Sequence, residues 1–170
     1  MLNIRDLTQT DPPVIAAACA AQGWDKHEAL YRGYYAEAMR GERDILVAED
    51  ESGHAGYVTI VWASDYPPFL AAGIPEIADF NVMKRCQRRG IGTALMNEAE
   101  RRIAQRSPIA GIGVGLPPDY GPAHILYIRR GYIPDGRGLW QARRTLQYGD
   151  SAIVNDDLAL YFTKVLDIGK

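Results

Sequence analysis

The chain has 170 residues, of which 47% are hydrophobic and 24% are charged, a composition ordinary for one soluble globular domain. Its net charge of −2 argues against a general nucleic-acid binder. No apolar run is long enough to cross a membrane, and the N-terminus lacks the features of a signal peptide. Two cysteines without a CxxC motif, Cys19 and Cys86, favour a reducing cytoplasm, and three scattered histidines predict no metal site.

The first part of the chain predicts a short strand followed by two helices. The strand covers residues 2–7. Asp11, as a capping residue before two prolines, predicts a helix through the alanine-rich run that follows. Asp25 and Glu28 have the spacing of a capping box and predict a second helix that ends at Gly41.

The middle of the chain predicts three strands interrupted by one loop. Strands over 44–49 and 56–62 are joined by a hairpin-type connection at Asp50–Gly53. The segment 64–75 contains three prolines and is predicted to be a loop. A third strand over 76–83 then runs directly into a glycine-rich stretch.

The second half continues the alternation of helices and strands. An apolar side chain every four residues predicts a helix from near Gly92 to Ser107. Strand 109–116 carries three glycines on one face, where another backbone or a ligand can approach closely. Pro122 opens a short helix, and a polar hairpin region separates the last two predicted strands, 131–134 and 157–166. Without an internal linker, residues 1–170 are expected to form one α/β domain.

The stretch "CQRRGIGTALMNEAE", from Cys86 to Glu100, combines cationic side chains with two glycines where a strand passes into a helix. The first N–H groups of a helix have no partner in the helix, and the helix dipole adds about half a positive charge there. Four cationic side chains in all lie at or beside this turn: Lys84, Arg85, Arg88 and Arg89. The turn therefore predicts a phosphate site, most naturally for a pyrophosphate.

Two common phosphate motifs are excluded. A P-loop needs Gly-x-x-x-x-Gly-Lys-Ser/Thr, which the chain lacks. A dinucleotide-binding turn needs a third glycine where Leu95 stands, and it belongs near the start of a βαβ unit rather than in mid-chain. The residues alone thus predict a pyrophosphate-containing cofactor.

Two motifs together resemble the GNAT acyltransferases, which bind acetyl-CoA. Gln87-Arg88-Arg89-Gly90-Ile91-Gly92 resembles the signature Gln/Arg-x-x-Gly-x-Gly/Ala, and Phe80-x-Val82 is similar to the apolar strand before it. Ala123-x-x-Leu126-Tyr127-x-x-x-Gly131-Tyr132 is similar to the second signature of the family. The resemblance implies a GNAT-like acyl-CoA-binding fold, with a single mixed, mostly antiparallel central sheet flanked by helices. The chain departs from the family where Tyr120 replaces a frequent asparagine.

The resemblance also implies residue roles. The backbone of Val82 and Met83 would pair with the pantetheine amides. Tyr127 would protonate the leaving thiolate, for which a phenol that stays protonated at neutral pH is suited. Glu76 occupies the position of a glutamate base, with Asp79 as the rival. The backbone N–H groups that would hold the pyrophosphate are those of Gln87, Arg88, Arg89, Gly90, Ile91, Gly92 and Thr93.

Each role has a structural alternative: a tight turn with solvated arginines, a core tyrosine at 127, and a solvated carboxylate at 76. We expect an N-acetyltransferase that passes acetyl directly from acetyl-CoA to a primary amine of a small molecule or a protein, without a cysteine nucleophile. A non-catalytic acyl-CoA sensor is the alternative. The acceptor stays open, as does the choice between monomer and homodimer. Asp65 with neighbouring aromatics, Trp62, Tyr66 and Phe69, hints at a cationic acceptor.

Overall fold

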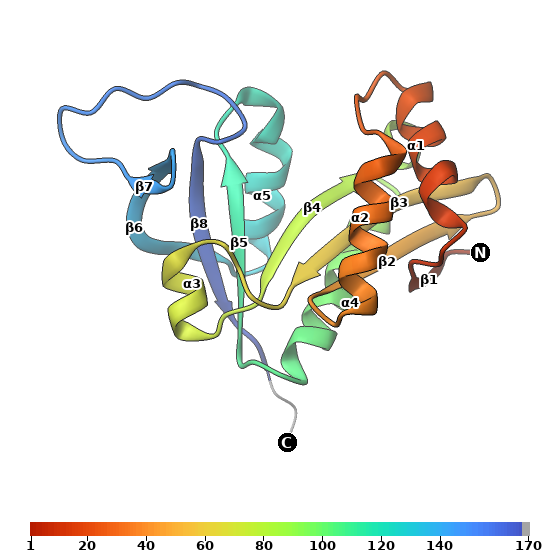
Figure 1. Cartoon of the computed structure of the whole chain (residues 1–170), viewed down its shortest axis with the longest axis horizontal. Coiled ribbons are helices and arrows are strands. Elements are labelled where there is room, and N and C mark those ends of the chain that lie inside the picture. The colour runs from red at the N-terminus through yellow and green to blue at the C-terminus, as the bar shows by residue number, and fades with distance from the viewer. Residues whose placement is uncertain (168–170) are drawn as a thin grey trace. The chain divides into compact units, whose positions relative to one another are not determined.

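The computed structural model describes residues 1–167 and has an α/β fold, in which helices flank an eight-stranded sheet (Figure 1). The chain divides into two compact units. The first comprises Met1–Trp62 and Ile77–Ile103, and the second comprises Ala63–Glu76 and the chain from Ala104 onward. The predicted fold class is confirmed, and each unit is built around its own strands.

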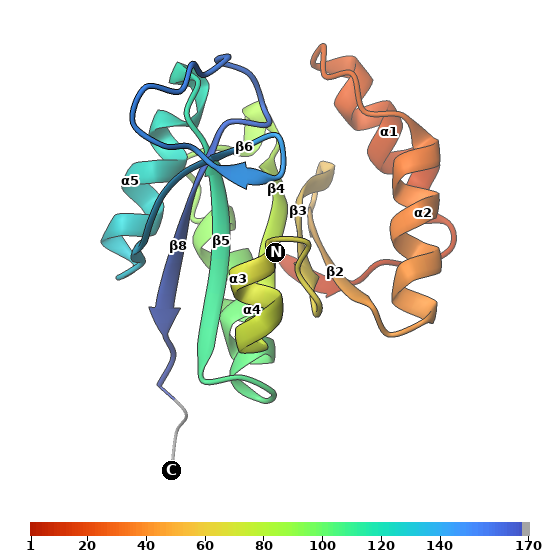
Figure 2. The same ribbon diagram turned by 60° about the vertical axis from the view of Figure 1, so that its left-hand side comes forward.

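The first unit has four strands in the order β1-β2-β3-β4, with antiparallel pairing from β1 to β3. Helices α1 and α2 cover one face of these strands and α4 covers the other (Figures 1 and 2). The elements are β1 (Asn3–Asp6), α1 (Asp11–Ala21), α2 (Glu28–Met39), β2 (Arg43–Asp50), β3 (Gly53–Val61), β4 (Glu76–Val82), the 3₁₀ turn η1 (Lys84–Cys86) and α4 (Ile91–Ala104). The apolar face predicted for α4 is buried, at Ile91, Leu95, Ala99 and Ile103.

The second unit has four strands in the order β5-β8-β6-β7, and β8 pairs antiparallel with both β5 and β6. In both views α3 and α5 lie on opposite sides of β5 and β8 (Figures 1 and 2). The elements are α3 (Pro67–Ala72), β5 (Ile109–Gly115), η2 (Pro118–Tyr120), α5 (Gly121–Arg129), β6 (Ile133–Gln141), β7 (Arg144–Thr145) and β8 (Ala159–Val165).

The glycine face of β5 allows close approach, but aromatic rings occupy it rather than the backbone or ligand that the sequence predicts. A Cβ atom at Gly111 would lie 2.2 Å from the Phe69 ring of α3, and one at Gly113 would lie 2.8 Å from the Tyr161 ring. Both distances are far below a van der Waals contact, so any larger residue would displace these rings. The glycines therefore let α3 and the β8 tyrosine approach the backbone of β5.

The segment predicted as a loop contains a helix, and that expectation is wrong. Pro67 and Pro68 stand at the first helical positions of α3, where their fixed φ angle suits the helix and their missing N–H is not needed. Gly73, with φ of +64°, ends the helix. Prolines that suggested a break thus start a short helix instead.

Both predicted helix caps are also wrong. Asp11 lies inside the first turn of α1, and its carboxylate accepts hydrogen bonds from the Thr8 N–H at 2.6 Å and from Arg5 Nη1 at 2.7 Å. For α2 the capping position is His27, which makes no side-chain cap bond, and Asp25 pairs with His27 at 3.0 Å. Asp11 is thus bound to Arg5 and the Thr8 N–H, and Asp25 is bound to the His27 side chain, so neither carboxylate caps its helix. In residues 1–167 no helix has the length and apolar character needed to span a membrane.

Candidate functional site

The glycine-rich turn of the first unit presents a row of backbone N–H groups. Arg88 and Gly90 have φ angles of +60° and +79°, and α4 begins directly afterwards at Ile91. The first helical hydrogen bond runs from the Ala94 N–H to the Gly90 carbonyl at 3.0 Å. Within residues 1–167, the N–H groups of 88–93 have no protein acceptor. This cradle fits an anion with several oxygens, as a pyrophosphate has.

The cations around the turn have different partners. Arg89 Nη1 binds Asp50 Oδ2 at 2.8 Å, and hydrogen bonds from Ser52 together with Arg89 lower the pKa of Asp50 to about 2. Arg85 Nη2 donates to the His54 carbonyl at 2.6 Å. These two arginines attach the turn to the β2–β3 hairpin. Arg88 is exposed, and in the described part of the chain its side chain has no ion pair, so its charge is available to a ligand.

The two residues expected to pair with pantetheine differ in their backbone contacts. The Met83 N–H donates to the Ala55 carbonyl at 2.9 Å, and the Met83 carbonyl accepts from Cys86 N–H at 2.7 Å. The Val82 carbonyl accepts a hydrogen bond from Gln87 Nε2 at 3.3 Å. Both backbone groups of Met83 thus have partners within the protein, and the Val82 carbonyl is bound to Gln87 of the family signature.

Gly92 has a packing role of its own. A Cβ atom there would lie 3.1 Å from the Phe80 ring tip and 3.5 Å from Val82 Cγ2. The missing side chain thus lets the first turn of α4 approach β4 closely, whereas a Cβ at Gly90 would meet nothing within 4 Å.

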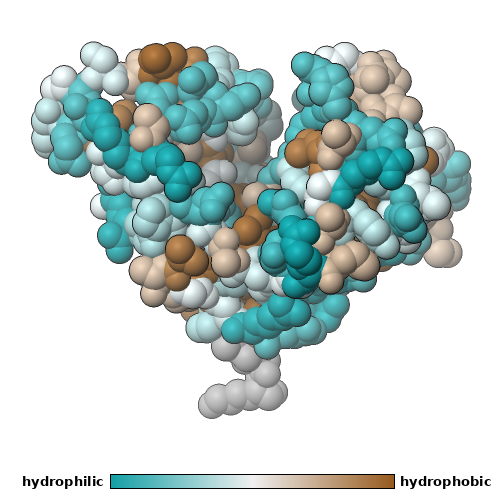
Figure 3. All heavy atoms as spheres, viewed as in Figure 1, coloured by the Kyte–Doolittle hydropathy of each residue, from teal (hydrophilic) through white to brown (hydrophobic). Residues whose placement is uncertain are grey.

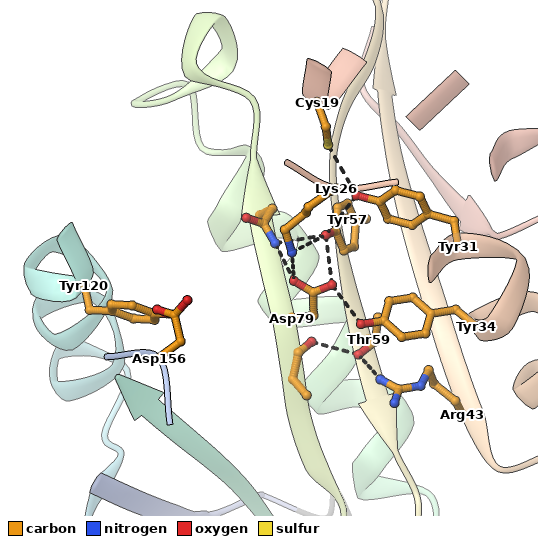
Figure 4. Close-up of polar contacts among 12 residues, drawn as sticks. Cys19, Lys26, Tyr31, Tyr34, Arg43, Tyr57, Thr59, Asp79, Tyr120 and Asp156 are labelled. Carbon is orange, nitrogen blue, oxygen red and sulfur yellow. Dashed lines mark hydrogen bonds and ion pairs between the residues drawn. The ribbon is translucent and has the colours of Figure 1, made fainter. Parts of the chain in front are cut away.

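Asp79 lies at the centre of a hydrogen-bonded network in the first unit (Figure 4). Tyr57 and Tyr34 hydroxyls each donate to its Oδ2 at 2.9 Å, and Asn81 Nδ2 donates to Oδ1 at 2.7 Å. Lys26 forms an ion pair with Oδ1 and also donates to the Tyr57 hydroxyl at 3.0 Å. The φ angle of Asp79 is +42°, which interrupts the regular alternation of β4. All acceptor sites of this carboxylate are used.

The network continues into the core between α1 and α2. The Tyr31 hydroxyl donates to the Tyr57 hydroxyl at 3.3 Å, and Cys19 Sγ lies 3.3 Å from the Tyr31 hydroxyl. Burial raises the pKa of the Cys19 thiol and of the Tyr57 phenol above their ordinary values. Both groups are therefore protonated at neutral pH, and Cys19 is no nucleophile.

Glu76 belongs to the second unit, at the start of β4. The Ser64 hydroxyl donates to Glu76 Oε2 and accepts from the Tyr66 N–H at 3.0 Å. Glu76 Oε1 and the Tyr161 ring meet above Gly113, 3.3 and 2.8 Å from the position of a Cβ there. The carboxylate is thus held at the edge of an aromatic cluster, half-buried rather than fully solvated.

Tyr127 also belongs to the second unit and is 5% exposed on α5. Its ring lies 6.0 Å from that of Tyr132, edge to face. Burial raises the pKa of Tyr127 above its ordinary value, and Tyr120 adds to the shift. The phenol therefore keeps its proton throughout the physiological pH range, as a proton donor must.

Sequence reasoning missed the partners that surround these residues. Lys26 reaches Asp79 from the connection between α1 and α2, and no local pattern links the two. Of the aromatics proposed near the acceptor, Tyr66 and Phe69 are buried, and the Trp62 indole donates to Asp44 at 2.9 Å. The rings that reach a pocket are instead Trp140 and Tyr161. Alternation along the last strand was the only available signal for Tyr161.

Comparisons with solved structures agree with the fold. The ribosomal-protein-S18-alanine N-acetyltransferase from Escherichia coli has a TM-score of 0.70 at 14% identity and covers 100% of this chain and 97% of its own. The ribosomal-protein-alanine N-acetyltransferase from Brucella melitensis has a TM-score of 0.69 at 19% identity, with coverage of 96% and 99%. The spermidine N-acetyltransferase from Vibrio cholerae, solved with CoA and spermine, has a TM-score of 0.67 at 14% identity, with coverage of 97% and 95%.

At these identities the likeness shows the fold alone. A search of the curated proteins found no match to the chain. The family model described as "Acetyltransferase (GNAT) domain" matches residues 41–134, more than half of the chain, including the glycine-rich turn and Tyr127. The turn, the second signature and the fold thus agree with this match, and the chain belongs to the GNAT family of acetyltransferases.

Proposed function

We propose that this protein is an N-acetyltransferase that transfers acetyl from acetyl-CoA directly to a primary amine. The observation that supports it most is the row of unpartnered N–H groups over 88–93, which belongs to a turn carrying the family signature. The acceptors in the names of two structural neighbours, an alanine of a ribosomal protein and spermidine, are both compatible with this chemistry.

The roles of the cofactor-binding residues follow from their contacts. The N–H groups of 88–93 and the Arg88 guanidinium would hold the pyrophosphate, while Arg89 keeps the turn in place through Asp50. The Gln87 N–H bonds to the Lys84 carbonyl at 3.4 Å, a long contact that a phosphate oxygen can replace. Val82 would pair with the pantetheine arm through its backbone.

The chemistry assigned to the side chains is proton transfer. The thioester of acetyl-CoA supplies an activated acyl group and a thiolate as leaving group. Glu76, directly or through water, would take the proton that the acceptor ammonium must lose before it attacks. Tyr127 would donate its proton toward the leaving sulfur. With its raised pKa, Tyr127 transfers this proton only as negative charge develops on sulfur, so its contribution belongs to the transition state.

The competing function is an acyl-CoA sensor without turnover. The buried, protonated Tyr127 favours the enzyme, because a sensor needs no proton donor at that position. The test is thiol release from acetyl-CoA with a panel of primary amines and peptide N-termini, with calorimetric acetyl-CoA affinity measured alongside. Turnover with any amine supports the enzyme, whereas binding without turnover across the panel supports the sensor.

We further propose that residues 1–170 act as one GNAT-like domain in the cytoplasm. The family model extends from the first unit into the second, and this supports a single functional domain.

A further inference from the structure

A small pocket lies within the second unit, beside an aromatic cluster formed by Tyr66, Phe69, Trp140 and Tyr161. It has a volume of about 210 Å³, below the ~300 Å³ at which cavities for drug-sized ligands begin. It is lined by Asp65, Pro67, Trp140, Arg143, Asp157 and Tyr161, and we call it the Asp65–Asp157 pocket. Its size fits a short aliphatic group rather than a nucleotide or a sugar.

The walls of this pocket are rigid and aromatic. The Tyr161 ring stacks on the buried Tyr66 ring with centroids 3.6 Å apart and planes 2° apart. The Trp140 ring meets Tyr66 edge to face at 5.0 Å. The Tyr66 hydroxyl donates to Asp135 at 2.8 Å, which fixes the ring supporting the other two. The pocket therefore keeps two aromatic rings in place for a ligand.

The charge of the pocket is negative. Asp65 and Asp157 line it together with one cation, Arg143, and among residues 1–167 no ion pair joins Arg143 to either aspartate. One oxygen of Asp157 accepts the Ala142 N–H at 2.8 Å. Within residues 1–167 the other oxygen accepts no hydrogen bond, so it can accept one from a ligand. Burial raises the pKa of the Tyr161 phenol, and the nearby carboxylates of Glu76, Asp157 and Asp65 raise it further. The carboxylates of Glu76, Asp157 and Asp65 thus all lie near the Tyr161 ring.

The pocket is next to the proposed base. Tyr161 contributes to the pocket wall and also meets the Glu76 carboxylate above Gly113. Tyr161 therefore borders both the pocket and the neighbourhood of the proposed base. The surface over β7 and the chain that follows it is mostly hydrophilic, whereas apolar residues appear over α3 (Figure 3).

We propose that the Asp65–Asp157 pocket binds a second cationic group of the acceptor, an alkylammonium joined to the reacting amine by a short methylene chain. The inference rests on the proposed acetyltransferase function for the reaction of the first amine. Carboxylates supply the charge, the Trp140 ring supplies cation–π contact with the ammonium, and both aromatic walls supply apolar contact with the methylenes. Acceptors of this class are diamines and longer polyamines.

The experiment compares three acceptors that differ at one end: 1,4-diaminobutane, 4-aminobutan-1-ol and 4-aminobutanoate. We expect kcat/KM for the diamine to exceed that for the amino alcohol by at least tenfold in the wild type. Asp65→Asn with Asp157→Asn should remove this preference and leave the KM of acetyl-CoA unchanged. Arg143→Gln should increase the preference, because it removes the one cation that opposes the ligand.

Asp156→Asn is the matched control, because it makes the same change of charge one residue away without lining the pocket. It should keep the preference. If the double variant does not fold, as judged by circular dichroism, Asp65→Asn alone serves the test. A preference for 4-aminobutanoate, or a diamine preference that survives the loss of both carboxylates, overturns the proposal.

A second measurement separates this inference from the proposed function. If no amine releases CoA, the acetyltransferase proposal fails, and calorimetry with 1,4-diaminobutane alone still tests the pocket. Binding that weakens at least tenfold in the double variant supports the pocket. Equal binding to wild type and double variant overturns it.

Discussion

At the scale of single residues, the two candidate bases have very different surroundings. Asp79 accepts from Lys26, Tyr57, Tyr34 and Asn81, which together occupy the roughly four lone-pair sites of a carboxylate. A carboxylate held in this way has no lone-pair site left for an acceptor amine, because each site already has a donor. Glu76 lies outside this network, beside the Asp65–Asp157 pocket, and is the better candidate for the base.

Glu76→Gln and Asp79→Asn should therefore have different effects, the first on activity and the second on stability. We expect Glu76→Gln to reduce kcat by at least tenfold and to remove the acidic limb of the pH–rate profile, with acetyl-CoA affinity unchanged. Asp79→Asn should keep that limb and instead lower the unfolding free energy by about 2 kcal/mol, since buried donors lose a charged partner. A lost acidic limb in Asp79→Asn, with a normal one in Glu76→Gln, would reverse the assignment.

Tyr127→Phe isolates the proton donor. The change keeps the buried ring and removes only the hydroxyl, so kcat should fall by roughly 10–100-fold while acetyl-CoA affinity stays at the wild-type value. Tyr132→Phe is the control, since it alters a neighbouring buried tyrosine 6.0 Å away. Equal turnover in both variants and wild type would show that Tyr127 only packs.

His54 predicts how stability depends on pH. Burial lowers its pKa from 6.5 to about 4, and within residues 1–167 neither ring nitrogen has a hydrogen-bond partner. Glu49 and Asp11 oppose this shift, whereas Arg85 and Arg5 add to it. Between pH 6.5 and 4 the unfolded chain binds a proton that the folded chain does not, so stability falls as the pH falls through this window.

With a pKa of 6.5 in the unfolded chain and about 4 in the folded one, the effect is limited to about 3 kcal/mol. Urea unfolding at pH 7 and pH 4.5 should show the loss in the wild type and a smaller one in His54→Phe. The Phe ring can keep the stacking on Tyr57, whose ring centroid lies 6.2 Å away. An identical loss in both proteins would assign it to other groups.

At the scale of elements, the two glycines of the glycine-rich turn, Gly90 and Gly92, have different structural roles. Gly90 has a positive φ and open space around it, whereas Gly92 has ordinary backbone angles and faces Phe80 at 3.1 Å. Substitution of Gly92 therefore disturbs the packing of α4 on β4 as well as any ligand. Gly90 is the cleaner position at which to test phosphate binding.

We expect Gly90→Asp to weaken acetyl-CoA binding by at least tenfold, about 1.4 kcal/mol, because it places a negative charge at the phosphate cradle. Gly90→Asn is the matched control, since asparagine has the same shape and also tolerates a positive φ. Calorimetry should find Asn closer to wild type than Asp. Equal affinities for the two variants would mean that the cradle binds no phosphate.

At the scale of the whole molecule, cosubstrate binding should stabilise the fold by mass action. Acetyl-CoA at one hundred times its Kd adds about 2.7 kcal/mol to the unfolding free energy. For a chain of 170 residues this should raise Tm by about 5–10 °C. Adenosine, which lacks the pyrophosphate, is the control and should give a much smaller shift at the same concentration. A shift of equal size with adenosine would contradict the role of the turn.

The sequence by itself determined the elements whose evidence is local. The turn after β4 and the apolar face of α4 were predicted correctly, because each depends on spacing along the chain; the glycine face of β5 was predicted to allow close approach, but not which groups would approach it. The two family motifs predicted the class of enzyme for the same reason. Local signals fail where one residue type favours two structures. Prolines favour both a loop and the first turn of a helix, and Pro67 and Pro68, which predict a loop, begin α3.

Only the tertiary structure decided which side chains meet across the sequence. Lys26 and Asp79 are 53 residues apart in the chain, and their ion pair helps to fill the acceptor sites of Asp79. Asp65 reaches Tyr161 and Asp157 only because β8 returns beside β5. Burial, partners and charge are set by such long-range contacts, which no local pattern encodes. These long-range contacts decide whether a carboxylate is part of a hydrogen-bonded network, is placed to accept a proton or lines a pocket.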